Sequence, residues 1–120
     1  MGARPLREIT DRERADFARD GAVLLKGLLS EEWVEKLAEG LDGVIAQSNV
    51  MTHDLGDNLR TDQFPSLRSE LLQSIVGDSP LAEVAGQVMK SSVRFYMDQL
   101  FYKAQGEVPP TPWHQDTCYY

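Results

Sequence analysis

Residues 93–103 read VRFYMDQLFYK, and this stretch decides how the chain is expected to fold. It is rich in β-branched and aromatic residues and contains neither glycine nor proline, which predicts one long strand. A turn-rich link with three prolines follows over residues 106–112. Residues 113–120, WHQDTCYY, then predict a second strand. β-Structure is therefore expected from about Ser92 onward.

The residues before this β-region carry helical patterns. Start and stop signals predict a helix over residues 11–20, and apolar residues at three-to-four spacing predict helices over residues 30–47, 65–78 and 79–90. The first of these has the capping-box spacing from Thr10 to Glu13. A short strand is predicted over residues 22–26, and the polar residues 49–64 predict a loop. The expected fold class is α+β in one domain, mainly helical over residues 1–91, with the first core strands over residues 92–120.

Composition and charge disfavour several classes of protein. The chain has 120 residues and a formal net charge of −7, and its basic residues are scattered. An acidic chain without a basic run disfavours nucleic acid and anionic membranes as partners. No apolar stretch approaches the roughly 20 residues that span a bilayer. Cys118 is the single cysteine, so no internal disulfide can form and a cytoplasmic location is expected.

The triplet His114-Gln115-Asp116 carries the chemistry of the predicted second strand. Side chains at i and i+2 of a strand point to one face, so His114 and Asp116 should project together. An imidazole nitrogen and a carboxylate oxygen suit two ligand positions of a non-haem iron(II) site. A triplet of this kind also occurs often by chance, as a surface carboxylate beside a hydrogen-bonded histidine.

The predicted strand over residues 93–103 carries two polar interruptions on an otherwise apolar face, Gln99 and Lys103. A buried lysine is costly unless it is paired, so Lys103 could meet an anionic ligand if this face lines a pocket. Alternatively, Lys103 extends past the strand end into solvent. The sequence leaves both interpretations open.

Other polar and aromatic residues are interpreted as structural. His53 and Asp54 lie in the predicted loop and form a solvated pair. Cys118 is expected to be a small packed thiol, because sulfur would be an unusual donor in this iron site. Tyr119 and Tyr120 are as compatible with simple packing as with lining a cavity mouth.

Two regions resemble the phytanoyl-CoA dioxygenase family. One comprises residues 95–103, FYMDQLFYK, the Gly/Pro-rich link, residues 112–116, PWHQD, and the following Tyr119. The other is residues 17–27, FARDGAVLLKG, which resemble the N-terminal entry into that family's first strand. The resemblance covers most of the chain and is weakest over residues 50–76.

This resemblance implies a double-stranded β-helix, or jelly roll, that binds iron(II), 2-oxoglutarate and dioxygen. His114 and Asp116 would be the first histidine and the carboxylate ligand of the iron. Lys103 matches a family lysine near the 2-oxoglutarate, and Gln99 would face the same cavity. In related halogenases a small residue replaces the carboxylate, so Asp116 implies hydroxylation of a C–H bond in a small-molecule substrate.

The sequence departs from the family pattern after the motif. The family's second metal histidine and its 2-oxoglutarate-binding arginine lie downstream of the His-x-Asp triplet, and a jelly roll has about eight strands. The chain is therefore expected to be the N-terminal part of an oxygenase, completed by a C-terminal part or a second chain, and to show no turnover alone. Two alternatives remain: a non-catalytic remnant that serves as an interaction module, and a helical structural domain with an accidental triplet.

Overall fold

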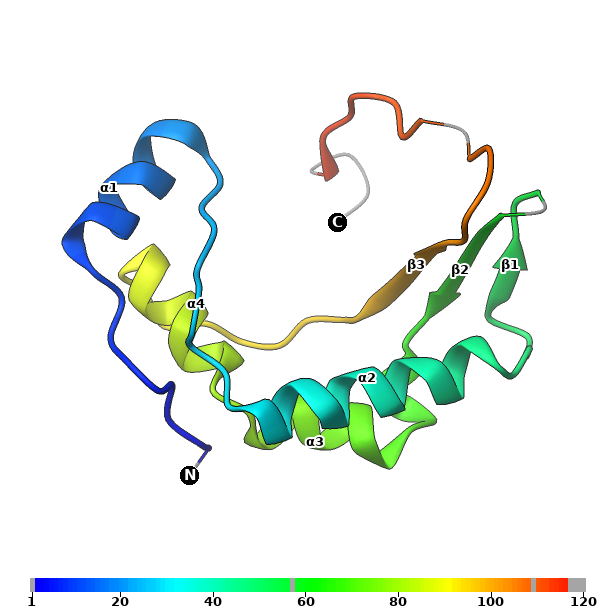
Figure 1. Ribbon diagram of the computed structural model, residues 1–120, viewed down its shortest axis with the longest axis horizontal. Coiled ribbons are helices and arrows are strands. Elements are labelled where there is room, and N and C mark those ends of the chain that lie inside the picture. Colours follow the sequence, from blue (N-terminus) through cyan, green and yellow to red (C-terminus); the bar gives the residue numbers. More distant parts are fainter. Residues whose placement is uncertain (1, 57, 109, 117–120) are drawn as a thin grey trace.

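The structure, a computed structural model, describes residues 2–56, 58–108 and 110–116. Helices and strands are both present in this part of the chain, which confirms the α+β class (Figure 1). The elements, in chain order, are α1 (Asp11–Asp20), α2 (Glu31–Ile45), β1 (Thr52–Asp54), β2 (Leu59–Gln63), the 3-10 helix η1 (Pro65–Leu67), α3 (Glu70–Asp78), α4 (Leu81–Met89) and β3 (Gln99–Lys103).

The first two helices begin at the capping residues that the sequence indicates. The Thr10 hydroxyl accepts from the Glu13 amide at 3.2 Å, and a Glu13 carboxylate oxygen accepts from the Thr10 amide at 2.9 Å. Gly21 ends α1 in the left-handed conformation, at φ 74°. Ser30 caps α2 by accepting from the Trp33 amide. Both helix predictions are confirmed, because local capping groups satisfy the free amides at a helix start.

The third predicted helix starts later than expected. Pro65 begins the short 3-10 helix η1 instead, and Ser69 caps α3 by accepting from the Leu72 amide. The cause is a distant contact: the Asp98 carboxylate accepts from the Ser66 amide at 2.8 Å and from the Ser66 hydroxyl at 2.9 Å. The fourth helix is confirmed as α4, which ends where Lys90 takes a left-handed conformation.

The predicted loop over residues 49–64 is wrong, because these residues contain the hairpin of β1 and β2. Asp62 is only 1% exposed, and this polar side chain is satisfied internally. Its carboxylate accepts from the Thr52 hydroxyl at 2.8 Å and the Asn49 amide at 2.9 Å, and it pairs with Arg68. A buried polar group of this kind hides the strand from any hydrophobicity pattern.

The sheet has the order β1-β2-β3 and is antiparallel throughout. β3 covers only the last part of the long strand predicted over residues 93–103. The carbonyl oxygen of Asp98 accepts from the Phe64 amide at 2.9 Å, where the chain leaves the ladder. The second predicted strand is also wrong where it can be assessed, since residues 113–116 form no strand, and residues 117–120 lie outside the described part.

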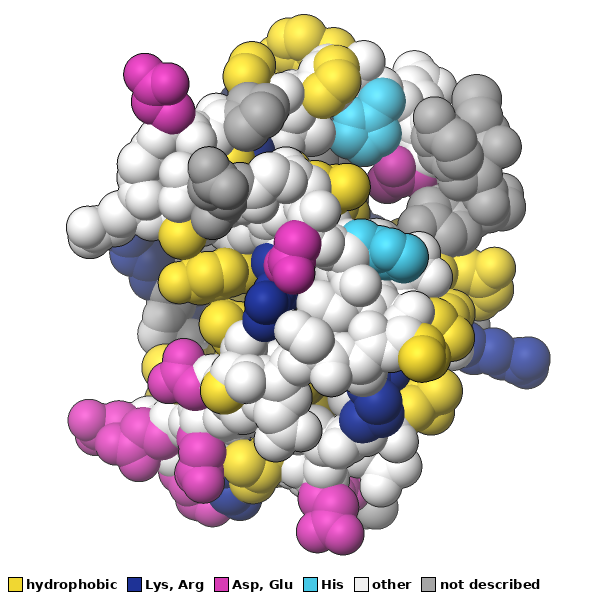
Figure 2. All heavy atoms as spheres, turned by 90° about the vertical axis from the view of Figure 1, so that its right-hand side faces the viewer, with side chains coloured by type: hydrophobic (Ala, Val, Ile, Leu, Met, Phe, Trp, Pro, Cys, Tyr) yellow, Lys and Arg dark blue, Asp and Glu magenta, His cyan; other side chains and the backbone are white. Residues whose placement is uncertain are grey.

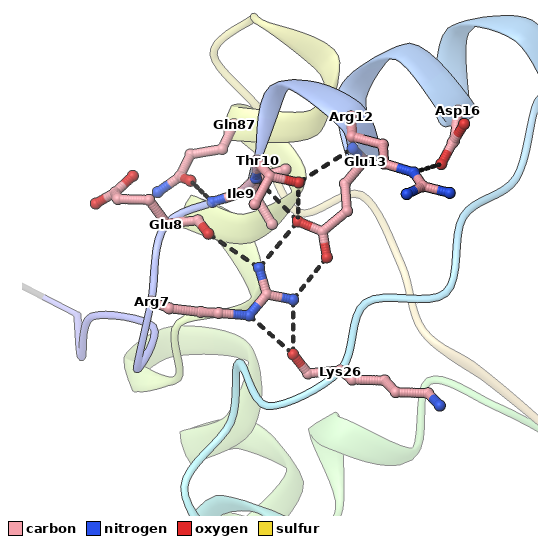
Figure 3. A network of polar contacts seen from close by, with 9 residues as sticks. All are labelled: Arg7, Glu8, Ile9, Thr10, Arg12, Glu13, Asp16, Lys26 and Gln87. Carbon is pink, nitrogen blue, oxygen red and sulfur yellow. Dashed lines mark hydrogen bonds and ion pairs between the residues drawn. The ribbon is translucent and has the colours of Figure 1, made fainter.

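The predicted strand over residues 22–26 does not form either, because its neighbour is the N-terminal segment rather than another strand (Figure 3). The Arg7 guanidinium donates to the Lys26 carbonyl oxygen at 2.6 and 3.0 Å and to the two Glu13 carboxylate oxygens at 2.6 and 2.9 Å. These bonds from Arg7, together with those from Thr10, lower the pKa of Glu13 to about 2.

Apolar packing joins the N-terminal segment to α4. Ile9, Leu28 and Val84 form a buried cluster, with Leu25 and Val88 packed against it. Figure 1 shows α1 and α4 at one end of the molecule, α2 and α3 running together along its base, and the sheet at the other end. After β3 the chain turns back above the sheet, so the His-x-Asp triplet is brought over the strand that precedes it.

Candidate metal centre

The candidate site lies on one face of the sheet, and the strand register defines that face. Leu59 is paired with Lys103 and Thr61 with Phe101, so these side chains share a face with Gln99. They form the floor of a hollow of about 710 Å³. Among the described residues its lining is Leu55, Leu59, Thr61, Gln99, Phe101, Lys103, Pro110, Thr111, Pro112, His114 and Asp116.

The segment after β3 forms the second wall of this hollow. The Ala104 amide donates to the Asn58 carbonyl oxygen at 2.8 Å, and the Asn58 side chain donates to the Glu107 carbonyl oxygen at 3.1 Å. Further along, the Lys103 ammonium donates to the Thr111 hydroxyl at 2.8 Å. These contacts hold the segment against the hairpin and place the triplet at the hollow.

His114 and Asp116 converge although they lie on no strand. The Nε2 atom of His114 is 3.3 Å from a carboxylate oxygen of Asp116. The Nδ1 atom of His114 lies 2.8 Å from the Pro112 carbonyl oxygen. A carbonyl can only accept, so Nδ1 carries the proton. In the neutral ring Nε2 then has a free electron pair, and it points toward the carboxylate.

This donor pair fits one metal ion. Two atoms bound at about 2.1 Å on adjacent corners of an octahedron lie about 3.0 Å apart. The observed 3.3 Å between nitrogen and oxygen is close to that separation. The side chains of His114 and Asp116 are 51% and 71% exposed, so a metal could reach them. Within the described residues no group of three or more His, Cys, Asp or Glu side chains could hold a metal.

All four residues singled out in the sequence, His114, Asp116, Lys103 and Gln99, line the same hollow. The alternation of Gln99, Phe101 and Lys103 on one face also holds, over the length of β3. Lys103 is exposed to solvent, as one interpretation expected, and its ammonium also lies in the hollow, where it donates to Thr111. Whether it binds an anion there stays a prediction. Cys118, Tyr119 and Tyr120 lie outside the described residues.

Sequence reasoning missed the contribution of the hairpin, which supplies Leu55, Leu59 and Thr61 to the hollow. The sequence Gly56-Asp57-Asn58 is typical of a turn, and it could have indicated a hairpin between the segments that form β1 and β2. His53 lies on β1 opposite Thr61, and not in a loop as expected. Both His53 and Asp54 are exposed, which confirms that this pair is solvated, and Asp54 also pairs with Arg60 at 2.7 Å. Figure 2 shows both histidines of the chain on one side of the molecule, one of them beside an acidic side chain.

Comparison with known proteins identifies the family of the chain. The family model described as phytanoyl-CoA dioxygenase (PhyH) matches residues 17–120. The chain belongs to the phytanoyl-CoA dioxygenase family, whose members are generally iron(II)- and 2-oxoglutarate-dependent dioxygenases. No curated protein and no solved structure matches the chain. None of the helices that the structure describes has the length and apolar content needed to span a bilayer.

Proposed function

We propose that this protein is an iron(II)- and 2-oxoglutarate-dependent dioxygenase that hydroxylates a C–H bond of a small molecule. One observation carries the proposal: a histidine and a carboxylate 3.3 Å apart share a hollow with a lysine, in a chain of this family. The three-stranded sheet would then be the beginning of a jelly roll, and the hollow would be its mouth.

His114 and Asp116 would hold the iron. The bond from Nδ1 to the Pro112 carbonyl fixes the ring orientation and leaves Nε2 for the metal, in the way that outer hydrogen bonds orient metal-binding histidines. Asp116 would supply the carboxylate ligand that a small residue replaces in related halogenases, which favours hydroxylation. The charge of Asp116 also offsets part of the metal's charge.

Lys103 and Gln99 would face the co-substrate. An ammonium group at the rim of the hollow attracts the carboxylates of 2-oxoglutarate, and the Gln99 amide can donate or accept a hydrogen bond. When bound, iron(II) with 2-oxoglutarate supplies the activation of dioxygen, with a net yield of succinate, carbon dioxide and hydroxylated substrate. The protein's own part is to orient the two ligands, bind the co-substrate's charge and leave the substrate room beside the metal.

A second function, as a non-catalytic binding module of the same fold, is favoured by the exposure of the pair. Side chains that are 51% and 71% exposed give metal chemistry little exclusion of water. Such a module would keep the hollow and its ligand contacts without converting a substrate.

Cobalt(II) titration followed by visible absorption tests the metal site. His114→Ala and Asp116→Ala should each weaken binding at least about tenfold, the equivalent of 1.4 kcal/mol. His53→Ala is the matched control, since His53 is an exposed histidine on the same sheet, opposite Thr61. Equal binding by wild type and His114→Ala would remove the proposal. Succinate formation with iron(II), 2-oxoglutarate and a substrate panel would exclude the binding module, whereas no turnover is expected of this chain by itself.

A further inference from the structure

Thr111 is the link between the two halves of the candidate site. Its hydroxyl accepts from the Lys103 ammonium at 2.8 Å. The segment carrying the triplet is held by Asn58 at Glu107, near its beginning. Beyond Glu107, across the residues that the structure describes, the Lys103–Thr111 bond is the one polar tie between this segment and the sheet.

The Lys103–Thr111 hydrogen bond can fix the position of His114 because the chain between Thr111 and His114 is short and stiff. Thr111 is followed by Pro112, whose ring fixes its own φ and restricts the residue before it. The Pro112 carbonyl oxygen then lies 2.8 Å from Nδ1 of His114. Fastening Thr111 to Lys103 therefore fixes where the His114 ring stands relative to β3.

The same bond orients the ammonium group. A lysine ammonium has three donors, and Thr111 accepts one of them. No ion pair joins Lys103 to a carboxylate among the described residues, so its remaining donors are open to a ligand in the hollow. We propose that Thr111 is a positioning residue that sets the Lys103 ammonium and the His114–Asp116 pair at a fixed separation, so that Lys103 can contact a 2-oxoglutarate held at the pair. This inference rests on the proposed function.

The order parameters of backbone amides test the role of the Lys103–Thr111 bond without any ligand. In ¹⁵N relaxation of the 120-residue chain, Thr111→Val and Lys103→Met should lower the order parameters of the His114 and Asp116 amides below about 0.6, and Thr111→Ser should keep wild-type values. The double variant should be no more mobile than either single variant. Unchanged order in Thr111→Val overturns the inference, whatever the protein binds.

Ligand affinity tests the consequence. With cobalt(II) present, Thr111→Val should weaken 2-oxoglutarate binding about 2- to 10-fold, the effect of one hydrogen bond. Cobalt(II) affinity itself should stay within twofold, and Thr111→Ser should restore 2-oxoglutarate binding. In a Lys103→Met background Thr111→Val should add less than twofold, because its effect passes through the lysine. Wild-type 2-oxoglutarate affinity in Thr111→Val overturns the inference alone, whereas cobalt(II) binding that does not depend on His114 overturns the proposed function.

Discussion

Gly40 and Gly43 lie on the same helix, α2, in very different surroundings, and replacing each by alanine separates packing from helix propensity. A Cβ atom at Gly40 would lie 2.8 Å from Cδ2 and 3.0 Å from Cγ of Leu72, and 3.3 Å from Cβ of Leu71. A Cβ atom at Gly43 would meet nothing within 4 Å. Gly40 is buried where α2 packs on α3, and Gly43 is exposed.

The magnitude follows from two opposing effects. Alanine is favoured over glycine in a helix interior by about 1 kcal/mol, and by less toward the end of α2, where Gly43 lies. At Gly40 the added methyl also crowds α3, and overpacking of this kind costs about 1–3 kcal/mol. The Leu72 side chain borders an apolar hollow of about 410 Å³ and can shift toward it. Cβ of Leu71 is fixed to the backbone, so the two helices must separate slightly.

We therefore expect Gly43→Ala to stabilise the protein by up to about 1 kcal/mol and Gly40→Ala to destabilise it by about 0–2 kcal/mol. The difference between the two variants isolates the contact, because both gain helix propensity. Urea unfolding monitored by circular dichroism measures both free energies, and the melting temperatures should differ by about 4 °C per kcal/mol. A Gly40→Ala protein as stable as Gly43→Ala would refute the close approach of α2 and α3.

Further predictions concern the polar networks. Because its bonds to Arg7 and Thr10 depress the folded pKa of Glu13 to about 2 from 4.5, the stability it contributes is complete above pH 4.5 and is lost as the pH falls toward 2. Urea midpoints of Glu13→Gln should thus lie below wild type at pH 6 and converge with it near pH 2; a constant gap would contradict this assignment. Asp62→Ala should cost about 2–4 kcal/mol, because it removes the carboxylate that forms the ion pair with Arg68 and accepts from two neutral donors, while Asp62→Asn should cost less; equal unfolding midpoints for the two variants would argue against the network. Asp98→Ala should free η1, seen as loss of protection of the Ser66 amide in hydrogen exchange, with Asp78→Ala as an exposed control.

The parts of the fold that the sequence predicted are those whose causes are local. Thr10 with Glu13, and Ser30 at the start of α2, satisfy helix amides within a few residues of themselves. Their pattern can therefore be read along the chain. The apolar spacing of α3 and α4 is local in the same sense, and those helices were also found.

The parts that failed depend on partners far along the chain. Asp62 is buried because Asn49, Thr52 and Arg68 surround it, and those contacts exist only once the hairpin has formed. β3 is shorter than its composition indicates because its partner β2 ends at Gln63 and the chain then forms η1, where Ser66 donates to the carboxylate of Asp98, 32 residues away. β-Propensity describes how well a residue fits a pleated surface, and it cannot report whether a neighbouring strand is there.

His114 and Asp116 lie close together without the strand from which their proximity was predicted. The prediction that His114 and Asp116 project together assumed a strand at residues 113–120, and residues 113–116 form none. The pair still converges, with 3.3 Å between Nε2 and the carboxylate, because one intervening residue keeps both side chains within reach and the Pro112 carbonyl turns the ring. The convergence of the two side chains therefore did not depend on the predicted strand. The triplet alone could not indicate which residues surround it. The Lys103–Thr111 bond holds it over a face of the sheet that β3 and the β1–β2 hairpin form together. In the proposed site the His114–Asp116 pair and Lys103 lie on two separate segments, and the hydrogen bond to Thr111 would hold them together.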